Sequence, residues 1–188
     1  MIITLSGITG VGKSYFKRCI IRALNFKNII IITTRKKRRG ERHGLDKYFL
    51  TEEQFQRLQK NGTISVAFEF LGNKYAYYTK DLLQTENSIT ELHYDTVKEF
   101  KKVAKDVISI YIKPMNIEVA KKQLKKRKLP KDVEITRLTE IEEQVIEFEK
   151  NKDLQQEFDY VFYNDYTKES TEKMLEFIND RIKEAMFC

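Results

Sequence analysis

The chain has 188 residues, of which 41% are hydrophobic and 12% aromatic, so it can build one globular core without disulfides or metal ions. Its 35 Lys and Arg residues against 28 Asp and Glu residues give a net charge of +7, which favours polyanionic partners such as nucleotides, nucleic acid or acidic membranes. Two cysteines, Cys19 and Cys188, define no disulfide framework, and no apolar run approaches the length of a membrane span. We therefore expect a cytoplasmic protein without a membrane partner.

The first predicted element is an apolar run at residues 2–5, which is typical of a buried strand. Apolar residues then recur at helical spacing from Ser14 to Leu24, and this spacing predicts a helix. A second apolar run at residues 29–32 suits a central parallel strand. Together these elements predict a strand, a helix and a second strand at the start of the chain.

The next segment, about residues 33–78, has a different composition and holds four of the seven glycines. A short helix is predicted around Phe55 and Leu58, followed by a hairpin that turns at Gly72 and Asn73. We interpret this segment as an inserted subdomain that binds a substrate.

Strands and helices alternate again after this insertion. Such alternation predicts an α/β fold, in which helices flank a central parallel sheet. The strands are expected at residues 88–92, 107–112 and 160–163, and the helices around residues 97–104, 135–148 and 174–182.

The glycine-rich loop GITGVGKS at residues 7–14 has the complete Walker A spacing and lies between a predicted strand and a predicted helix. Backbone N–H groups of such a loop converge on phosphate oxygens, and the positive end of the following helix points at the same charge. Lys13 is expected to reach the β- and γ-phosphates of ATP, and Ser14 to ligate Mg²⁺. The expected ATP-binding residues of the loop are Gly7, Thr9, Gly10, Val11, Gly12, Lys13 and Ser14.

This loop specifies a nucleotide but no reaction, because GTPases, motor ATPases and small-molecule kinases share it. The following residues 33–41, TTRKKRRGE, continue through Gly44, Asp46 and Phe49. They resemble the guanylate kinase pattern T-T-R-x-x-R-x-G-E-x-x-G-x-D-Y-x-F. Other residues fall where that family has them, namely Gly72, Asn73 and Tyr75, Pro114 before a helix ending at Arg127, Arg137, Asn164 and Asp165.

The resemblance covers nearly the whole chain, and it implies a P-loop kinase fold. A single guanylate-kinase-like domain at residues 1–188 would comprise a core at 1–32 and 86–188, with a lid at about 122–138. A small mixed or antiparallel β subdomain at about 33–85 would bind the monophosphate. The implied reaction is transfer of phosphate from ATP, with Mg²⁺, to a nucleoside monophosphate, foremost GMP or dGMP.

The resemblance also implies roles for single residues. Arg35, Arg38 and Tyr75 match residues that hold the acceptor monophosphate, a role that suits forked guanidinium groups and a phenol donor. Arg127 and Arg137 match lid arginines that close over the donor phosphates and face the charge of the transition state. With Lys13, these four arginines are the expected catalytic residues, and Asn164 is expected at the ATP site.

The chain departs from the family where the base would be recognised. The glutamate expected six residues before Gly72 falls on Val66, although Glu69 follows three residues later. The small hydroxyl residue expected two positions after Tyr75 falls on Tyr77. Family members use that glutamate and hydroxyl to recognise guanine. Glu69 and Tyr77 are expected at the acceptor site, and a base other than guanine stays open.

Two further positions concern the acceptor. The tyrosine expected after Asp46 is Lys47, which can bind phosphate as a point charge. The family's L-D-I-D stretch aligns with residues 90–93, so Glu91 takes the place of the first aspartate, near the acceptor and magnesium. Glu91 is either a ligand of magnesium-bound water or an exposed carboxylate at the end of a strand. His93 is by default a structural histidine.

Two other classes of function remain as alternatives. Guanylate-kinase-like domains also serve as protein-binding adaptors, but these have a degraded phosphate loop, which is intact here. Nucleic-acid binding is not expected, because the phosphate sites account for most of the basic residues and no base-stacking motif is evident. The sequence does not predict an oligomeric state.

Overall fold

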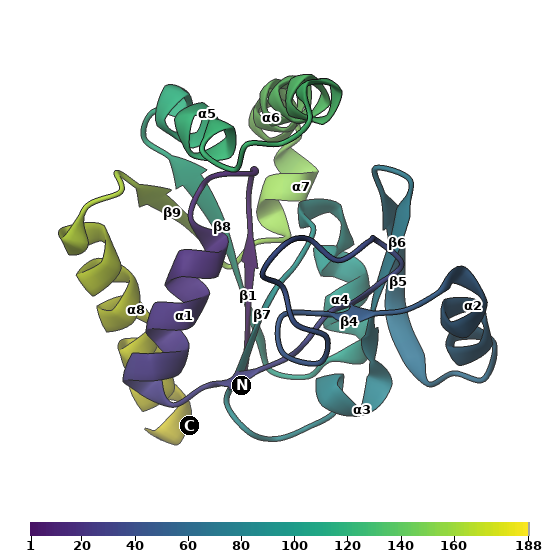
Figure 1. The fold of residues 1–188 in the computed structure, drawn as a ribbon. Coiled ribbons are helices and arrows are strands. Elements are labelled where there is room, and N and C mark those ends of the chain that lie inside the picture. The colour runs from purple at the N-terminus through teal and green to yellow at the C-terminus, as the bar shows by residue number, and fades with distance from the viewer. Residues whose placement is uncertain (188) are drawn as a thin grey trace.

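The structure, a computed structural model, describes residues 1–187 and contains two β-sheets with helices packed against them (Figure 1). The larger sheet is formed by β1 (Ile2–Ser6), β2 (Lys27–Asn28), β7 (Ser88–Glu91), β8 (Val107–Pro114) and β9 (Tyr160–Asn164). Its strands are parallel and lie in the order β2-β7-β1-β8-β9. This architecture confirms the predicted α/β fold with a central parallel sheet.

The central strand β1 is buried along its whole length, as expected for a parallel strand that is covered on both faces. Ile3 and Leu5 pack into the cluster that includes Phe16 of α1 (Lys13–Leu24) and Ile178 of α8 (Lys168–Phe187). Ile2 points to the other face, where it joins the cluster of Phe100 in α4 (Val97–Val103). The alternation along β1 therefore divides the core between the two faces of the sheet.

The apolar run at residues 29–32 does not form the predicted central strand. The strand that pairs with β7 is Lys27–Asn28, at the edge of the larger sheet, with one further backbone hydrogen bond from Ile29 to Ile89, and Ile32 already belongs to the smaller sheet. Ile29 and Ile31 are buried because the chain crosses between the two sheets here. A buried crossing requires the same apolar residues as a buried strand, so the local sequence does not distinguish the two.

The smaller sheet is mixed, with the strand order β4-β3-β6-β5, and stands beside the larger one (Figure 1). Its strands are β3 (Ile32–Thr33), β4 (Tyr48–Phe49), β5 (Ile64–Phe70) and β6 (Asn73–Tyr78). The predicted hairpin is confirmed, since β5 and β6 are antiparallel and Gly72 between them has a φ of 66°. The predicted short helix is also confirmed as α2 (Glu52–Lys60), which begins with a capping box of Thr51 and Gln54.

The other predicted strands and helices are confirmed, with ends that differ by a few residues. Figure 1 shows α5 and α6 together above the carboxyl end of the larger sheet.

None of the helices formed by residues 1–187 has the length and hydrophobicity of a membrane-spanning segment. Cys19 carries a free thiol, whereas Cys188 lies outside the described residues. The remaining helices are α3 (Thr79–Leu82), α5 (Ile117–Lys125), α6 (Lys131–Lys150) and α7 (Lys152–Gln156).

Candidate active site

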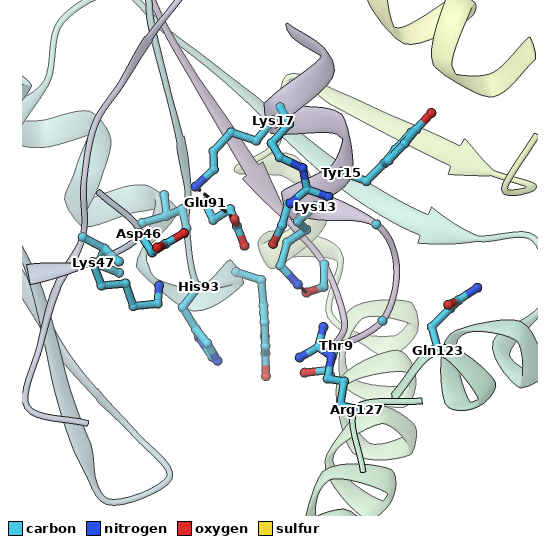
Figure 2. Close-up of a pocket in the computed structure, with 18 of the residues that line it drawn as sticks. Thr9, Lys13, Tyr15, Lys17, Asp46, Lys47, Glu91, His93, Gln123 and Arg127 are labelled. Atoms are coloured by element: carbon cyan, nitrogen blue, oxygen red, sulfur yellow. Dashed lines mark hydrogen bonds and ion pairs between the residues drawn. The ribbon is translucent and has the colours of Figure 1, made fainter. Parts of the chain in front are cut away.

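A cavity of about 970 Å³ opens at the carboxyl ends of β1 and β7. This volume is near the upper end of the range for ligand pockets, and strand ends of this kind are where α/β sheets bind ligands. The phosphate loop, residues 7–14, lines one part of the cavity, and the segment of residues 35–47 lines another. Figure 2 shows Thr9 and Arg127 on one side of it, and Asp46, Lys47 and His93 on the other.

Two glycines hold the phosphate loop against its neighbours. Gly7 has a φ of 132°, and a Cβ atom at this position would lie 2.3 Å from the carbonyl oxygen of Ile112. Gly10 has a φ of 86°, and its Cβ would lie 2.3 Å from the carbonyl oxygen of Ala120. The loop therefore requires glycine both for its backbone angles and for its close contact with β8 and α5.

Lys13 lies inside the curve of the phosphate loop. Its Nζ donates hydrogen bonds to the carbonyl oxygens of Gly7 at 2.7 Å and of Ile8 at 2.9 Å. Burial lowers the pKa of Lys13 to about 8, and an anion in the loop would offset that effect. The following Ser14 is exposed to the cavity, and no side chain caps the amino end of α1. These features leave the end of the helix open to a phosphate group.

Asn164, at the end of β9, holds the phosphate loop although β8 lies between β9 and β1. Its buried Nδ2 donates a hydrogen bond to the carbonyl oxygen of Val11 at 2.9 Å, and its Oδ1 accepts one from the backbone of Tyr166 at 2.8 Å. Asn164 also lines the cavity, whereas the side chain of Val11 is fully buried below the loop. The role that the structure supports for Asn164 is therefore positioning of the loop backbone.

Four arginines from two separate segments line the same cavity. Arg35 and Arg38 follow β3, whereas Arg127 lies in the turn after α5 and Arg137 lies within α6. Burial lowers the pKa of Arg38, and the nearby charges of Arg35, Arg137 and Arg127 lower it further. Such a concentration of guanidinium groups is stable only near anions, so the cavity suits phosphate groups.

Glu41 organises the two arginines of the acceptor segment. Its carboxylate accepts two hydrogen bonds from Arg35 Nη2, at 2.7 and 3.0 Å, and one from the backbone N–H of Arg38 at 2.7 Å. The carboxylate therefore fixes the direction of Arg35, while the guanidinium of Arg38 stays available. This geometry gives a physical reason for the glutamate at the end of the TTRKKRRGE segment.

Arg137 has two partners in the cavity wall. Its Nη1 donates to Glu140 at 3.0 Å, and its guanidinium lies 5.1 Å from the ring centre of Phe70. Glu140 is buried, and burial raises the pKa of its carboxyl group, which also accepts a hydrogen bond from Gln144 at 2.8 Å. Sequence reasoning missed Glu140 and Gln144. The available signal was that both fall on the apolar face of α6, three and seven residues after Arg137.

Glu91, at the end of β7, lies among lysines (Figure 2). Its carboxylate is 3.1 Å from the Nζ of Lys17. Burial opposes the charged form of Glu91, but Lys17, Lys47 and Lys13 more than offset this effect and lower its pKa to about 2. The structure therefore places Glu91 in the cavity as expected. Sequence reasoning missed Lys17, since only the fold brings the second turn of α1 next to the end of β7.

Two residues expected at the acceptor do not line the cavity. Tyr77 has no exposed surface, and its hydroxyl donates a hydrogen bond to the carbonyl oxygen of Glu91 at 2.7 Å. Glu69 is exposed on β5, where strand alternation points it away from the cavity-lining Phe68 and Phe70. Glu69 therefore does not take the place of the glutamate that the family pattern has at position 66. An irregularity in the pairing between Ser65 and Phe68, where Val66 has a φ of 51°, interrupts the alternation between the two positions.

The acceptor side of the cavity is instead lined by aromatic side chains. Tyr75, expected at the monophosphate, lines the cavity and stacks on Phe68 with 5.2 Å between ring centres. His93 also lines it, lies 4.4 Å from the ring centre of Phe70, and pairs through Nδ1 with Asp95. Among the described residues, the buried Nε2 of His93 has no hydrogen-bond partner. A planar base could stack on such a wall.

A family model described as guanylate kinase matches residues 1–181. Among known proteins, the guanylate kinase of Malacoplasma penetrans (strain HF-2) is 30% identical over 191 residues, covering 97% of this chain and 94% of that protein. The guanylate kinase of Lactobacillus johnsonii (strain CNCM I-12250 / La1 / NCC 533) is 27% identical over 172 residues, covering 88% and 81%.

A comparison with solved structures supports the same fold. The crystal structure of guanylate kinase from Anaplasma phagocytophilum matches with a TM-score of 0.73 at 22% identity, covering 96% of this chain and 85% of that one. Shikimate kinase from Bacteroides thetaiotaomicron matches with a TM-score of 0.52 at 16% identity, covering 97% and 98%. Because the family model spans nearly the whole sequence, this chain belongs to the guanylate kinase family.

Proposed function

We propose that this protein transfers the γ-phosphoryl group of ATP to a nucleoside monophosphate, with GMP as the principal acceptor. The observation that carries the proposal is a single cavity that joins an intact phosphate loop to a second, arginine-lined part. A GTPase or a motor ATPase would need only the first part. Membership of the guanylate kinase family points to the same reaction.

In this proposal the phosphate loop binds ATP. Backbone N–H groups of the loop and Lys13 would hold the β- and γ-phosphates, and the amino end of α1 would add a favourable dipole. Thr9 lines the cavity beside the loop, and Asn164 keeps the loop backbone in place. The contact of Lys13 with two loop carbonyls would then be exchanged for contacts with phosphate oxygens.

Arg35, Arg38 and Tyr75 would hold the phosphate of the acceptor. Arg127 and Arg137 would stabilise the charge that spreads over the moving phosphoryl group, and closure of the lid, about residues 122–138, would exclude water. Phosphoryl transfer of this kind needs no covalent enzyme intermediate, because positioning and charge supply the catalysis. In this scheme Glu140 keeps Arg137 at the cavity.

Magnesium fits this site as a partner of bound phosphates. Within residues 1–187, no three His, Cys, Asp or Glu side chains gather as a metal site. Mg²⁺ commonly takes most of its ligands from phosphate oxygens and water, so one protein hydroxyl is sufficient. Ser14 Oγ, exposed to the cavity, would supply that ligand. The ion would offset the negative charge of the phosphates during transfer.

A second candidate keeps the same chemistry with a base other than guanine. The specific observation in its favour is that Tyr77 and Glu69 do not line the cavity and that position 66 holds Val66. The acceptor wall of Phe68, Phe70 and Tyr75 stacks on any base and does not by itself select guanine.

A coupled assay of ADP formation over GMP, dGMP, IMP, AMP, CMP, UMP and TMP tests both candidates. We expect turnover that depends on both the monophosphate and Mg²⁺, with the highest kcat/KM for GMP. A higher value for another acceptor would favour the second candidate. Absence of turnover with every acceptor would contradict the kinase proposal, and undetectable ATP binding by calorimetry would then favour a protein-binding role.

We place the reaction in the cytoplasm, which the free thiol of Cys19 favours.

A further inference from the structure

Lys47 immediately precedes β4, and its side chain lines the acceptor part of the cavity (Figure 2). The residue is half-buried, yet within residues 1–187 its ammonium group has no hydrogen bond and no ion pair. A cation removed from water is stable only if an opposite charge approaches it. The position therefore requires a partner that the protein itself does not supply.

The carboxylates near Lys47 are already engaged by other residues. Glu91 from β7 pairs with Lys17 from α1 at 3.1 Å, and Glu41 pairs with Arg35 at 2.7 Å. Glu91 and Glu41 attract Lys47 electrostatically, whereas Lys17 and Arg35 repel it. Neither carboxylate is free to neutralise it.

The balance of charge indicates what the missing partner is. Lys47, Lys17, Arg35 and Arg38 line this part of the cavity together with three carboxylates, Glu41, Asp46 and Glu91. Glu41 pairs with Arg35, Glu91 pairs with Lys17, and Asp46 accepts a hydrogen bond from the backbone N–H of Arg42, so Lys47 and the guanidinium of Arg38 are not paired with a carboxylate among residues 1–187. A phosphate monoester carries close to two negative charges at neutral pH. Such a group can pair with both Lys47 and Arg38.

We propose that Lys47 is a ligand of the acceptor phosphate and completes its binding site with Arg35, Arg38 and Tyr75. This inference rests on the proposed function and adds a residue to that site. The family pattern has a tyrosine at this position, which would be a neutral donor, whereas a lysine provides a full charge on a flexible stem. Binding of the acceptor to this protein should therefore depend on the charge state of one side chain.

The titration of Lys47 supports the same assignment. Burial, assisted by Lys17 and Arg35 and opposed by Glu91 and Glu41, lowers the pKa of Lys47 to about 8. A phosphate dianion beside it would raise the pKa again. At pH 7 Lys47 is mostly protonated already, so binding takes up few protons there. Above pH 8 binding requires a proton, and the affinity for the monophosphate should fall as the pH rises.

The first experiment compares Lys47→Met, Lys47→Arg and the control Lys80→Met by calorimetry at pH 7 with GMP and, separately, with ATP. Lys80 is exposed in the same segment and does not line the cavity. Its substitution therefore makes the same change of charge as Lys47→Met, but outside the cavity. We expect Lys47→Met to raise the Kd for GMP about 10- to 100-fold, as for loss of a charge-assisted hydrogen bond, with Kd for ATP within about 2-fold. Lys47→Arg and Lys80→Met should bind GMP nearly as the wild type does.

The second experiment measures proton uptake on GMP binding near pH 8.5, in two buffers that differ in ionisation enthalpy. The wild type should take up more protons than Lys47→Arg, because arginine stays charged at this pH. Subtracting the Lys47→Arg value removes the ionisation of GMP and of Lys13, whose pKa is also about 8. This difference is a readout that a merely structural role of Lys47 would not produce.

Several results would overturn the assignment. An equal loss of affinity for GMP and for ATP in Lys47→Met would contradict the assignment. Equal proton uptake by the wild type and by Lys47→Arg would also contradict it. So would wild-type protein that binds neither GMP nor inorganic phosphate. Because these measurements concern binding, they are separate from turnover. A protein that binds GMP through Lys47 but transfers no phosphate would contradict the kinase proposal alone.

Discussion

The proposed donor and acceptor parts of the cavity are built in different ways. The donor part is a run of eight consecutive residues, 7–14, whose backbone contacts β8 and α5 through Gly7 and Gly10. The acceptor part takes single side chains from separate segments, including Arg38 after β3 and Tyr75 from β6. One part is therefore a continuous backbone structure, whereas the other is an assembly of side chains.

This difference shows where the chemistry of the site can change. A site made of backbone N–H groups depends on the course of the chain, so most of its residues cannot be replaced without moving the loop. A site made of side chains can change one residue at a time while the fold stays the same. The departures from the family pattern at Lys47, Val66 and Tyr77 fall between residues 33 and 85, the proposed acceptor subdomain, and a further one, Glu91, lies at the end of β7. Substitutions in each part, with matched controls, test whether the function and stability of one part can change without affecting the other.

Lys13→Met should have the largest effect and should act on the donor part alone. Loss of the cation that contacts the transferred phosphoryl group should lower kcat about 10³-fold, or about 4 kcal/mol of transition-state stabilisation. The Kd for GMP, measured by calorimetry without ATP, should stay within about 2-fold of the wild type. An equal loss of GMP affinity would show that the two parts are coupled.

Gly7→Ala should destabilise the fold more than Gly72→Ala, although both glycines have positive φ. At Gly7 the added Cβ meets the carbonyl oxygen of Ile112 at 2.3 Å, and we expect a loss of about 3 kcal/mol in the free energy of unfolding. At Gly72 no atom lies within 4 Å, and we expect a loss of about 1 kcal/mol from backbone strain alone. Urea denaturation of both variants measures the difference, and equal losses would contradict the tight packing of the loop.

Arg38→Ala should weaken the acceptor part selectively. Removal of a guanidinium that is free to grip phosphate should raise KM for GMP about 10- to 100-fold, or about 1.4 to 2.7 kcal/mol. The neighbouring Arg39 is exposed and does not line the cavity, so Arg39→Ala is the matched control and should leave KM for GMP unchanged. Steady-state kinetics at saturating ATP provides the comparison. Similar KM values for the two variants would remove Arg38 from the phosphate site.

Tyr77→Phe should have the smallest effect. The variant loses the hydrogen bond to the carbonyl oxygen of Glu91, and we expect a cost of about 1 kcal/mol in the free energy of unfolding. Because Tyr77 does not line the cavity, the order of preference among nucleoside monophosphates should not change. Thermal unfolding and the acceptor panel measure the two effects, and an altered preference would place Tyr77 at the base.

Local signals predicted much of the fold correctly. The helix around Phe55 has a strong capping box, and the turn at Gly72 needs a residue that tolerates positive φ, so both are visible in short stretches of sequence. The strand predicted at residues 29–32 was wrong, because burial between two sheets and burial within one sheet select the same apolar residues. Local patterning gives no information about which sheet a segment joins.

The candidate site shows the same distinction between features set by local sequence and features set by tertiary contacts. The sequence by itself determined the phosphate loop, because its eight residues are consecutive and each glycine is required by local backbone geometry. The tertiary structure alone decided that Lys17 neutralises Glu91, that Tyr77 turns away from the cavity, and that Lys47 has no partner among residues 1–187. Those outcomes depend on contacts between distant segments, and the electrostatics of a buried charge depend on all of its neighbours at once.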